Sequence, residues 1–169
     1  MVENLKNRTN PLVAVFSGVF DPVTAGHLDI IRRGSAIFHR LIVAVGTNPE
    51  KMELFNKQER VELIQELTQD LPNVEIDSYE GLTFDFVKAV GGSVILKGIR
   101  DTVDLRYELQ QANTNRLAGG IETLFMLATD VHALTSSTLI KQVASMGGDV
   151  GRLVPELVAK RLRAKLGKK

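Results

Sequence analysis

The stretch with the clearest chemical potential is residues 16–27, which read FSGVFDPVTAGH. It lies between an apolar run that predicts a buried strand, 12–16, and a pattern that predicts a helix over 26–38. Gly18 lets the backbone of the intervening turn approach a ligand closely, and the free N–H groups of a helix start attract anionic oxygens. His27 falls in the first helical turn, where it could reach a phosphate and donate a proton toward developing charge. We therefore expect a phosphate-binding site here.

Two well-known phosphate motifs do not fit this stretch. No Gly-Lys-Ser/Thr follows the turn, as a P-loop requires, and the glycine spacing is not Gly-x-Gly-x-x-Gly. A histidine at a helix start, taken blindly, more often caps or packs than takes part in chemistry. The interpretation of His27 therefore depends on the residues around it.

Residues 18–27 form the string Gly-x-Phe-Asp-Pro-x-Thr-x-Gly-His, which resembles the signature of the nucleotidyltransferase superfamily. Its members carry Thr-x-Gly-His or His-x-Gly-His, and residues 24–27 are that tetrad here. The resemblance is closest to the bacterial phosphopantetheine adenylyltransferases and extends from about residue 12 to the last predicted helix. It implies transfer of AMP from ATP to 4′-phosphopantetheine, giving dephospho-coenzyme A and pyrophosphate. It also implies that His27 stabilises the transition state.

The composition is that of an ordinary globular protein. The chain has 169 residues, 44% hydrophobic and 24% charged, so we expect one domain over 1–169, with residues 1–10 as a flexible extension. The net charge of +1 argues against nucleic-acid binding, and no apolar run predicts a membrane span or a secretory signal. The lack of cysteine excludes disulfides, thiolate catalysis and cysteine-bound zinc. We expect a cytoplasmic protein with no nucleic-acid or membrane partner.

Strand and helix patterns alternate along the chain, which is typical of βαβ units and a parallel sheet. The predicted strands are 12–16, 41–45, 74–77, 94–96 and 122–127. The predicted helices cover 26–38, start near 55, 83, 102 and 138, and end with one that begins at Pro155. The fold class is therefore α/β: a doubly wound, Rossmann-like sheet of five parallel strands with helices on both faces.

Some helix details can be predicted from apolar spacing and capping preferences. Thr83 is expected to cap its helix, and Asp101 or Thr102 the next one. Residues expected to face the core are Leu28, Ile31 and Ile37 in the first helix, and Leu105, Leu109, Ala112 and Leu117 in the long one.

Polar clusters follow the strands at their carboxyl ends, where parallel sheets bind ligands. Lys97 and Arg100 flank Gly98 after the fourth strand, and two cations at such a place favour an anion. The Ser/Thr cluster 135–138 could be only a helix cap, and Glu108 only an exposed helical residue, but the resemblance places both at ATP. The ATP-binding residues implied are Gly18, Val19, Phe20, His27, Gly98, Ile99, Arg100, Glu108, His132, Ala133, Leu134, Thr135, Ser136, Ser137 and Thr138.

On the acceptor side, the resemblance implies that 4′-phosphopantetheine contacts Val19, Lys51, Leu82, Thr83 and Lys97. Three of these depart from the family pattern: Val19 replaces a Thr or Ser, Thr83 a Met, and Lys97 an Arg. Lysine keeps the charge but lacks the bidentate fork of arginine. A fourth change, Thr135 for Ile, lies on the ATP side. The sequence thus supports adenylyl transfer more strongly than it supports the identity of the acceptor.

The resemblance also implies a Mg²⁺ cofactor, a homohexamer, and feedback by coenzyme A at the active site. No carboxylate cluster in the sequence looks like a dedicated metal site, so we predict no protein metal ligands and a Mg²⁺ held by the nucleotide. Two alternatives remain open at this point. One is another adenylyl- or cytidylyltransferase of the superfamily, and the other is a nucleotide-binding protein without catalysis.

Overall fold

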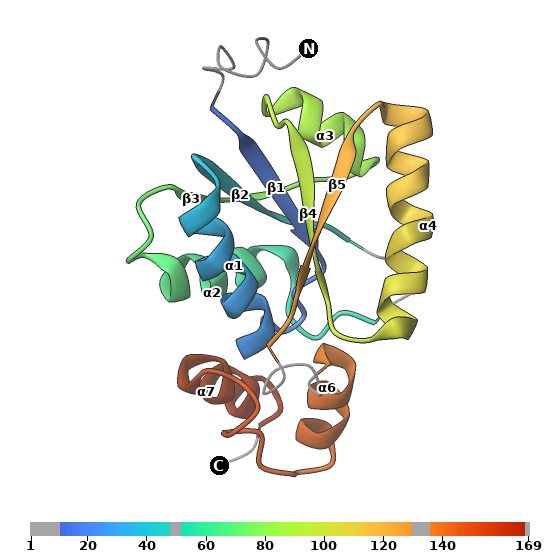
Figure 1. The fold of residues 1–169 in the computed structure, drawn as a ribbon. Helices are drawn as coiled ribbons and strands as arrows, with labels where there is room; N and C mark the ends of the chain where they lie inside the picture. The colour runs from blue at the N-terminus through green and yellow to red at the C-terminus, as the bar shows by residue number, and fades with distance from the viewer. Residues whose placement is uncertain (1–10, 48–51, 130–135, 168–169) are drawn as a thin grey trace, which may run out of the picture.

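The computed structural model describes residues 11–47, 52–129 and 136–167. Strands and helices alternate in it as the sequence predicts (Figure 1). In chain order the elements are β1 (Val13–Gly18), α1 (Ala25–Ile37), β2 (Arg40–Val45), α2 (Lys57–Thr68), β3 (Val74–Ser78), α3 (Thr83–Ala89), β4 (Val94–Ile99), α4 (Thr102–Gly119), β5 (Glu122–Leu127), α6 (Ser137–Ser145) and α7 (Glu156–Lys165).

The strands form one five-stranded sheet in the order β3-β2-β1-β4-β5. Every neighbouring pair is parallel. The chain order reverses at the boundary between β1 and β4, because β2 and β3 extend the sheet one way and β4 and β5 the other. Ligands bind at such a reversal in doubly wound sheets, outside the carboxyl ends of the strands.

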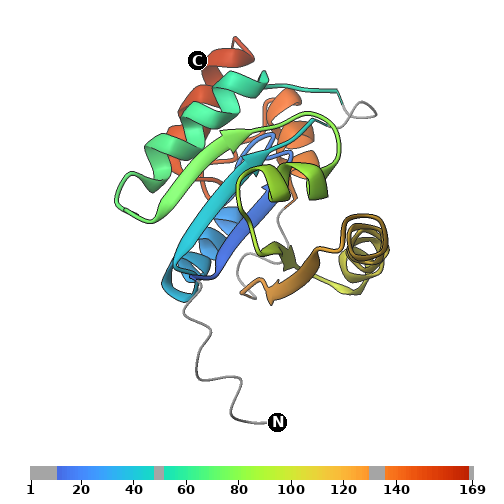
Figure 2. The ribbon, with the colours of Figure 1, turned by 90° about the horizontal axis from the view of Figure 1, so that it is seen from above.

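Helices cover both faces of this sheet, as predicted. On one face, Phe16, Val43 and Leu96 belong to a core cluster that also contains buried residues of α1, α2, α6 and α7. On the other face, Val15 and Ile95 pack with Val87 of α3. Figure 2 shows α4 on the opposite side of the strands from α2 and α7. The uninterrupted apolar runs of β1 and β2 follow from this burial of both faces.

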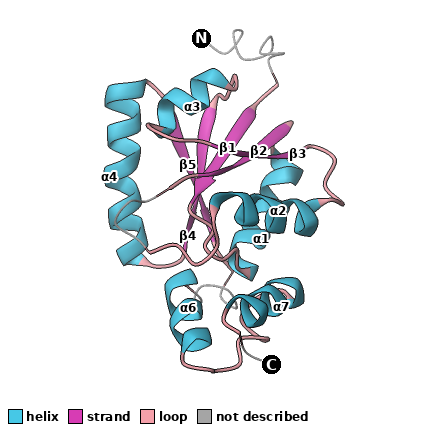
Figure 3. Ribbon diagram, turned by 180° about the vertical axis from the view of Figure 1, so that it is seen from behind, coloured by secondary structure: helices cyan, strands magenta, loops and turns pink. Residues whose placement is uncertain are grey.

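The last two helices lie beyond the carboxyl ends of the strands. Figures 1 and 3 show α6 and α7 side by side there, below the sheet in both views. Lys165 of α7 donates to Glu59 of α2 at 2.7 Å, and Arg161 donates to Glu66 at 3.0 Å. These two ion pairs hold α7 against α2.

Two boundary predictions are wrong. β4 continues to Ile99, so Lys97 and Gly98 lie within the strand, paired with Phe125 and Met126 of β5, and not in a loop after it. Thr83 is the first residue of α3 and does not cap it. The N-cap is Leu82, which makes no side-chain capping hydrogen bond.

Some core predictions are also wrong. Ile37 is 65% exposed, and the buried positions of α1 are Ile30, Ile31 and Gly34. Leu109 and Leu117 of α4 are exposed as well, and the buried residues of that helix are Asn115 and Gly119. Apolar spacing indicates a helix face, but the packing of the helix decides which part of that face is covered.

The capping prediction for α4 is confirmed. Asp101 accepts hydrogen bonds from the backbone N–H groups of Val103 and Asp104, both at 2.8 Å. The helix ends at Gly120, which has the left-handed φ of 68° that glycine adopts without strain. Among the described residues, no helix is both long and apolar enough to cross a membrane.

Candidate active site

A cavity of about 630 Å³ opens at the carboxyl ends of the strands. Its lining includes residues from the turn after β1, from β4, α3 and α4, and from the start of α6. Most of the predicted site residues that the structure describes line it: Gly18, Val19, Phe20, His27, Thr83, Lys97, Gly98, Arg100, Glu108, Ser136, Ser137 and Thr138. Segments far apart in the sequence therefore meet at one place.

Seven predicted site residues are not among those lining residues. Ile99 is buried, and Leu82 is 57% exposed, so neither side chain lines the cavity. Lys51, His132, Ala133, Leu134 and Thr135 lie outside the described residues. Their roles stay predictions.

The turn after β1 is tightly packed around Gly18. A Cβ built on Gly18 would lie 2.9 Å from Cζ of Phe20, so only glycine fits without moving the ring. Phe20 itself has a φ of 52°, which is uncommon for a non-glycine residue. Its ring packs edge-on against His27 and Phe16, with centroids 5.0 and 5.3 Å apart. The turn thereby fixes the position of the His27 imidazole.

The N-terminal cap of α1 fixes the protonation of His27. The backbone N–H of Thr24 donates to Nδ1 of His27 at 3.0 Å, and the backbone N–H of His27 donates to the Thr24 hydroxyl at 3.3 Å. Because a backbone N–H can only donate, Nδ1 must accept, and the proton of the neutral ring is on Nε2. Burial lowers the pKa of His27 to about 4, and the charge of Arg100 contributes to the shift. His27 is therefore a neutral Nε2–H donor at the cavity.

Two cations of β4 and its end lie in the cavity wall. Nζ of Lys97 donates to the carbonyl of Ser17 at 3.2 Å and lies 3.4 Å from a carboxylate oxygen of Glu108. Arg100 donates to both carboxylate oxygens of Asp104, at 2.6 and 2.8 Å. The hydrogen bond from Arg100 to Asp104 raises the pKa of the guanidinium. Both cations are thus held in place before a substrate binds.

Gly98 brings the helix of His27 close to these cations. It lies between Lys97 and the end of β4, and a Cβ built on it would be 3.0 Å from Cγ1 of Ile30 in α1. Glycine therefore lets α1 pack directly on β4, which places the histidine and the two cations around the same space.

The Ser/Thr cluster begins α6 beside the same turn. Ser136 is the N-cap and accepts from the backbone N–H of Leu139 at 3.1 Å. Ser137 donates its hydroxyl proton to the carbonyl of Pro22 at 2.9 Å. The cap role and the predicted ligand role are compatible, because the cap accepts from Leu139, while the N–H groups of Ser137 and Thr138, which also line the cavity, have no partner within the helix.

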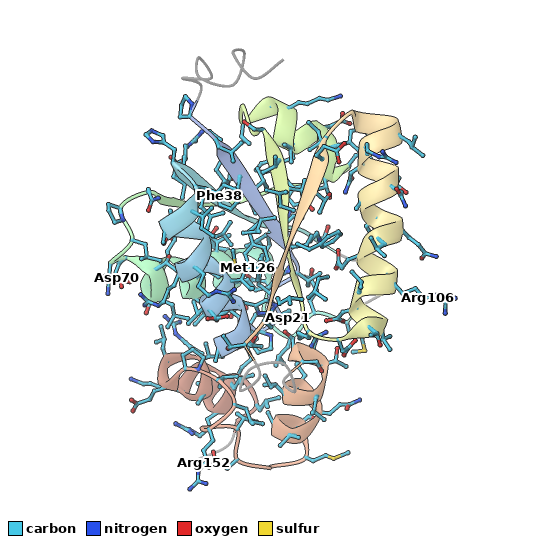
Figure 4. The ribbon with its side chains drawn as sticks, in the orientation of Figure 1. Asp21, Phe38, Asp70, Arg106, Met126 and Arg152 are labelled. Carbon is cyan, nitrogen blue, oxygen red and sulfur yellow. The ribbon has the colours of Figure 1, made fainter. Side chains whose placement is uncertain are left out.

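An ion pair that the sequence analysis missed joins α6 to the first motif. Lys141 donates to Asp21 at 2.8 Å, and the Asp21 carboxylate also accepts from the backbone N–H groups of Leu54 and Phe55, both at 2.9 Å. Asp21 is 3% exposed, and Figure 4 places it between the sheet and α6. Both residues line the cavity. The place of Asp21 within the first motif could have indicated a functional role for this residue. Nothing near Lys141 in the sequence indicates that it pairs with a residue 120 positions away.

A second missed residue is Arg60, whose side chain is completely buried. It donates to the carbonyls of Val19 and Gly46 at 2.8 and 3.1 Å, and to Glu53 at 2.7 Å. The loops that follow β1 and β2 are thereby tied to α2. No sequence pattern indicates this role, because an arginine at the start of a helix is usually solvated.

Among the residues that the structure describes, the carboxylates that line the cavity do not form an obvious metal-binding site. Asp21, Asp104 and Glu108 each face a basic side chain, namely Lys141, Arg100 and Lys97. Within the described residues there is no group of three or more His, Cys, Asp or Glu side chains that could hold a metal ion. The donor set fits a Mg²⁺ that enters with nucleotide phosphates better than one bound by protein alone.

Comparison with known proteins agrees with this geometry. A family model described as cytidylyltransferase-like matches residues 15–143. A phosphopantetheine adenylyltransferase of Caldanaerobacter subterraneus subsp. tengcongensis is 46% identical over 157 residues, covering 92% of this chain and 98% of that one. The enzyme of the same name from a Nocardioides species is 48% identical, covering 90% of this chain and 96% of that one.

A solved structure supports the fold independently of close sequence similarity. The putative nicotinate-nucleotide adenylyltransferase of Vibrio parahaemolyticus superposes with a TM-score of 0.66 at 15% identity, covering 94% of this chain and 96% of that chain. At that identity the likeness concerns the fold alone. The family expected from residues 18–27 is confirmed by the sequence relatives: the chain belongs to the phosphopantetheine adenylyltransferases of the nucleotidyltransferase superfamily.

Proposed function

We propose that the protein transfers AMP from ATP to 4′-phosphopantetheine, forming dephospho-coenzyme A and releasing pyrophosphate in coenzyme A synthesis. The single observation that carries the chemistry is the neutral His27, held with its Nε2–H available in a cavity that Lys97 and Arg100 also line. The curated relatives at 46% and 48% identity support the choice of acceptor. They weigh against another adenylyl- or cytidylyltransferase, and His27 weighs against a binding protein without catalysis.

The proposed reaction is a direct in-line displacement. An oxygen of the acceptor phosphate forms a bond to the α-phosphorus of ATP while the bond from that phosphorus to the bridging oxygen of pyrophosphate breaks. No covalent enzyme intermediate is required, so positioning and charge stabilisation supply the acceleration. His27 donates Nε2–H to a phosphoryl oxygen that gains charge in the transition state. Lys97 binds the acceptor phosphate, and Arg100 and the start of α6 bind the phosphates of ATP.

We propose Mg²⁺ as the cofactor, carried by the nucleotide. It would neutralise the leaving pyrophosphate, which is the role that divalent cations have in phosphoryl transfer. The protein's contribution is to hold the phosphates at which the ion sits, through Arg100 and the Ser136–Thr138 segment. Protein carboxylates are not required as ligands.

We propose further that the chain forms a homo-oligomer, with the hexamer of its family as the expected state. Apolar side chains are exposed along α4 and on β5, the edge strand of the sheet, and Leu117 and Leu127 are 82% and 71% exposed. Exposed apolar surfaces at the edge of a sheet usually pack against another chain. The exposed residues are Val103, Tyr107, Leu109, Leu117, Leu124, Phe125 and Leu127. Sedimentation at micromolar concentration should show an assembly, and a monomer would contradict the proposal.

Coenzyme A shares the phosphopantetheine arm and the adenylyl group of the product, so we propose that it competes for the same cavity. The cytoplasm is the compartment we propose for the reaction, since both ATP and the acceptor are used there.

The experiment that tests the function is pyrophosphate release from Mg²⁺-ATP with a panel of acceptors. We expect turnover with 4′-phosphopantetheine, and a fall in kcat of about 10²–10³-fold in His27→Ala, the usual effect of removing one transition-state donor. Thr114→Val is the matched control, because its hydroxyl bonds the Gln110 carbonyl of its own helix outside the cavity. Turnover with a different acceptor alone would move the assignment to a neighbouring family. Nucleotide binding without any turnover, unchanged in His27→Ala, would refute the catalytic proposal.

A further inference from the structure

A pair of hydroxyl groups lies in the cavity wall away from the proposed phosphate contacts. The phenol oxygen of Tyr79 and Oγ1 of Thr83 are 2.9 Å apart, and both residues line the cavity and are half-buried. A hydrogen bond between two hydroxyls uses only one of their two protons. The other proton, and the remaining oxygen lone pairs, are available to a ligand.

The Tyr79 ring is held rigidly in this position. It stacks on the ring of Phe86, with centroids 4.9 Å apart and planes inclined by 24°. The ring also lies close to Gly46, where an added Cβ would be 3.1 Å from both Cζ and the phenol oxygen. The phenol oxygen therefore has a fixed position before a ligand binds, which lowers the entropy cost of a hydrogen bond to that ligand.

Tyr79 lies on the same face of the sheet as Lys97. Val15 and Ile95 belong to the core cluster on the α3 face, and Tyr79 packs against that cluster. Because side chains alternate along a strand, Ser17 and Lys97, two positions after these residues, share that face. Ser17 adds a buried hydroxyl with no hydrogen-bond partner among the described residues. This side of the cavity is thus polar from Lys97 toward Tyr79.

An acceptor whose phosphate sits at Lys97 would extend its organic arm over this face. The α1 side is occupied by His27, and the α6 side by Ser136–Thr138, where we place the nucleotide. The phosphopantetheine arm contains two amide groups, and an amide carbonyl is a good acceptor for a hydroxyl proton. The polar wall therefore matches the chemistry of the arm.

We propose that Tyr79 and Thr83 form an acceptor-specificity element, in which the free hydroxyl proton of the pair binds an amide carbonyl of the phosphopantetheine arm. This inference rests on the proposed function. It gives Thr83, which departs from the methionine of its family, a polar role that depends on Tyr79. It also predicts that the two hydroxyls act as a unit.

The test compares Tyr79→Phe and Thr83→Val, which remove one hydroxyl each and keep the shape. We expect the KM for 4′-phosphopantetheine to rise about 3- to 10-fold in each, the effect of one neutral hydrogen bond. The KM for ATP and kcat should stay within twofold of the parent values. The double variant should be little worse than either single one, because the hydroxyls share one function. Thr114→Val serves as the control.

The dissociation constant of 4′-phosphopantetheine, measured by titration calorimetry, separates this inference from the proposed function. If the parent protein binds the acceptor without turning it over, the catalytic proposal fails, while the affinities of the variants still decide the hydroxyl role. Acceptor affinity and KM unchanged within twofold in both variants would refute the inference. Equal weakening of ATP and acceptor would also refute it, because the pair would then support the whole site. If the parent protein does not bind 4′-phosphopantetheine at all, both the proposed function and the inference about the two hydroxyls are overturned.

Discussion

The protonation of His27 should appear in the stability of the protein as a function of pH. The folded-state pKa is about 4, against 6.5 for the unfolded chain. Between these values the unfolded chain binds more protons than the folded one, so the free energy of unfolding falls as the pH is lowered through this range. Applied to these two values, linkage gives a loss of about 2 kcal/mol between pH 7 and pH 5 from this residue alone.

The informative variant is His27→Gln. Glutamine at this position can still accept the backbone N–H of Thr24, as the third helical residue of a capping box does, but it does not titrate. We therefore expect the variant to lose about 2 kcal/mol less stability than the parent protein between pH 7 and pH 5. Carboxylates that titrate in both proteins cancel in this difference.

The assay is urea unfolding followed by circular dichroism at pH 7 and pH 5. The protomer concentration must be equal throughout, because association changes apparent stability. A pH dependence that is the same in both proteins within about 0.5 kcal/mol would show that His27 is not held neutral. Nε2 of His27 would then not be the hydrogen-bond donor of a neutral imidazole.

Three further substitutions test the packing that supports the site. Gly18→Ala should destabilise the protein by about 1–3 kcal/mol in urea unfolding, because the new methyl group meets the Phe20 ring; an unchanged midpoint would contradict this. Asp21→Asn should cost about 3–5 kcal/mol by leaving Lys141 without its buried partner, and adding Lys141→Met should recover part of that loss. Arg60→Lys should be about as destabilising as Arg60→Met, since one ammonium cannot replace the guanidinium fork, and rescue by lysine in thermal unfolding would argue against the geometry.

Local sequence signals were sufficient for the order of elements and for the first motif. Uninterrupted apolar runs predicted strands covered on both faces, and alternation with helices predicted the parallel doubly wound sheet. The Thr24-to-His27 spacing contains the capping box itself, because that interaction joins residues within one helical turn. Such features depend on near neighbours in the chain and can be predicted without knowing the fold.

Burial predictions were less successful, because they depend on packing partners. Ile37 continues the apolar stripe of α1 but lies beyond the part that the sheet covers. The apolar residues of α4, among them Leu117, have the spacing of a core face and yet are exposed. A hydrophobic pattern shows that a surface prefers to be covered, but it does not show what covers it.

The sequence by itself determined the fold class and the family, and it singled out His27 as the proposed transition-state donor, because these depend on local pattern and on a contiguous motif. The tertiary structure decided how the residues act. It made His27 a neutral donor by burial, paired Lys141 with Asp21 across 120 positions, and placed Arg60 under two loops. These properties arise from desolvation and from contacts between distant segments, and neither exists until the chain has folded.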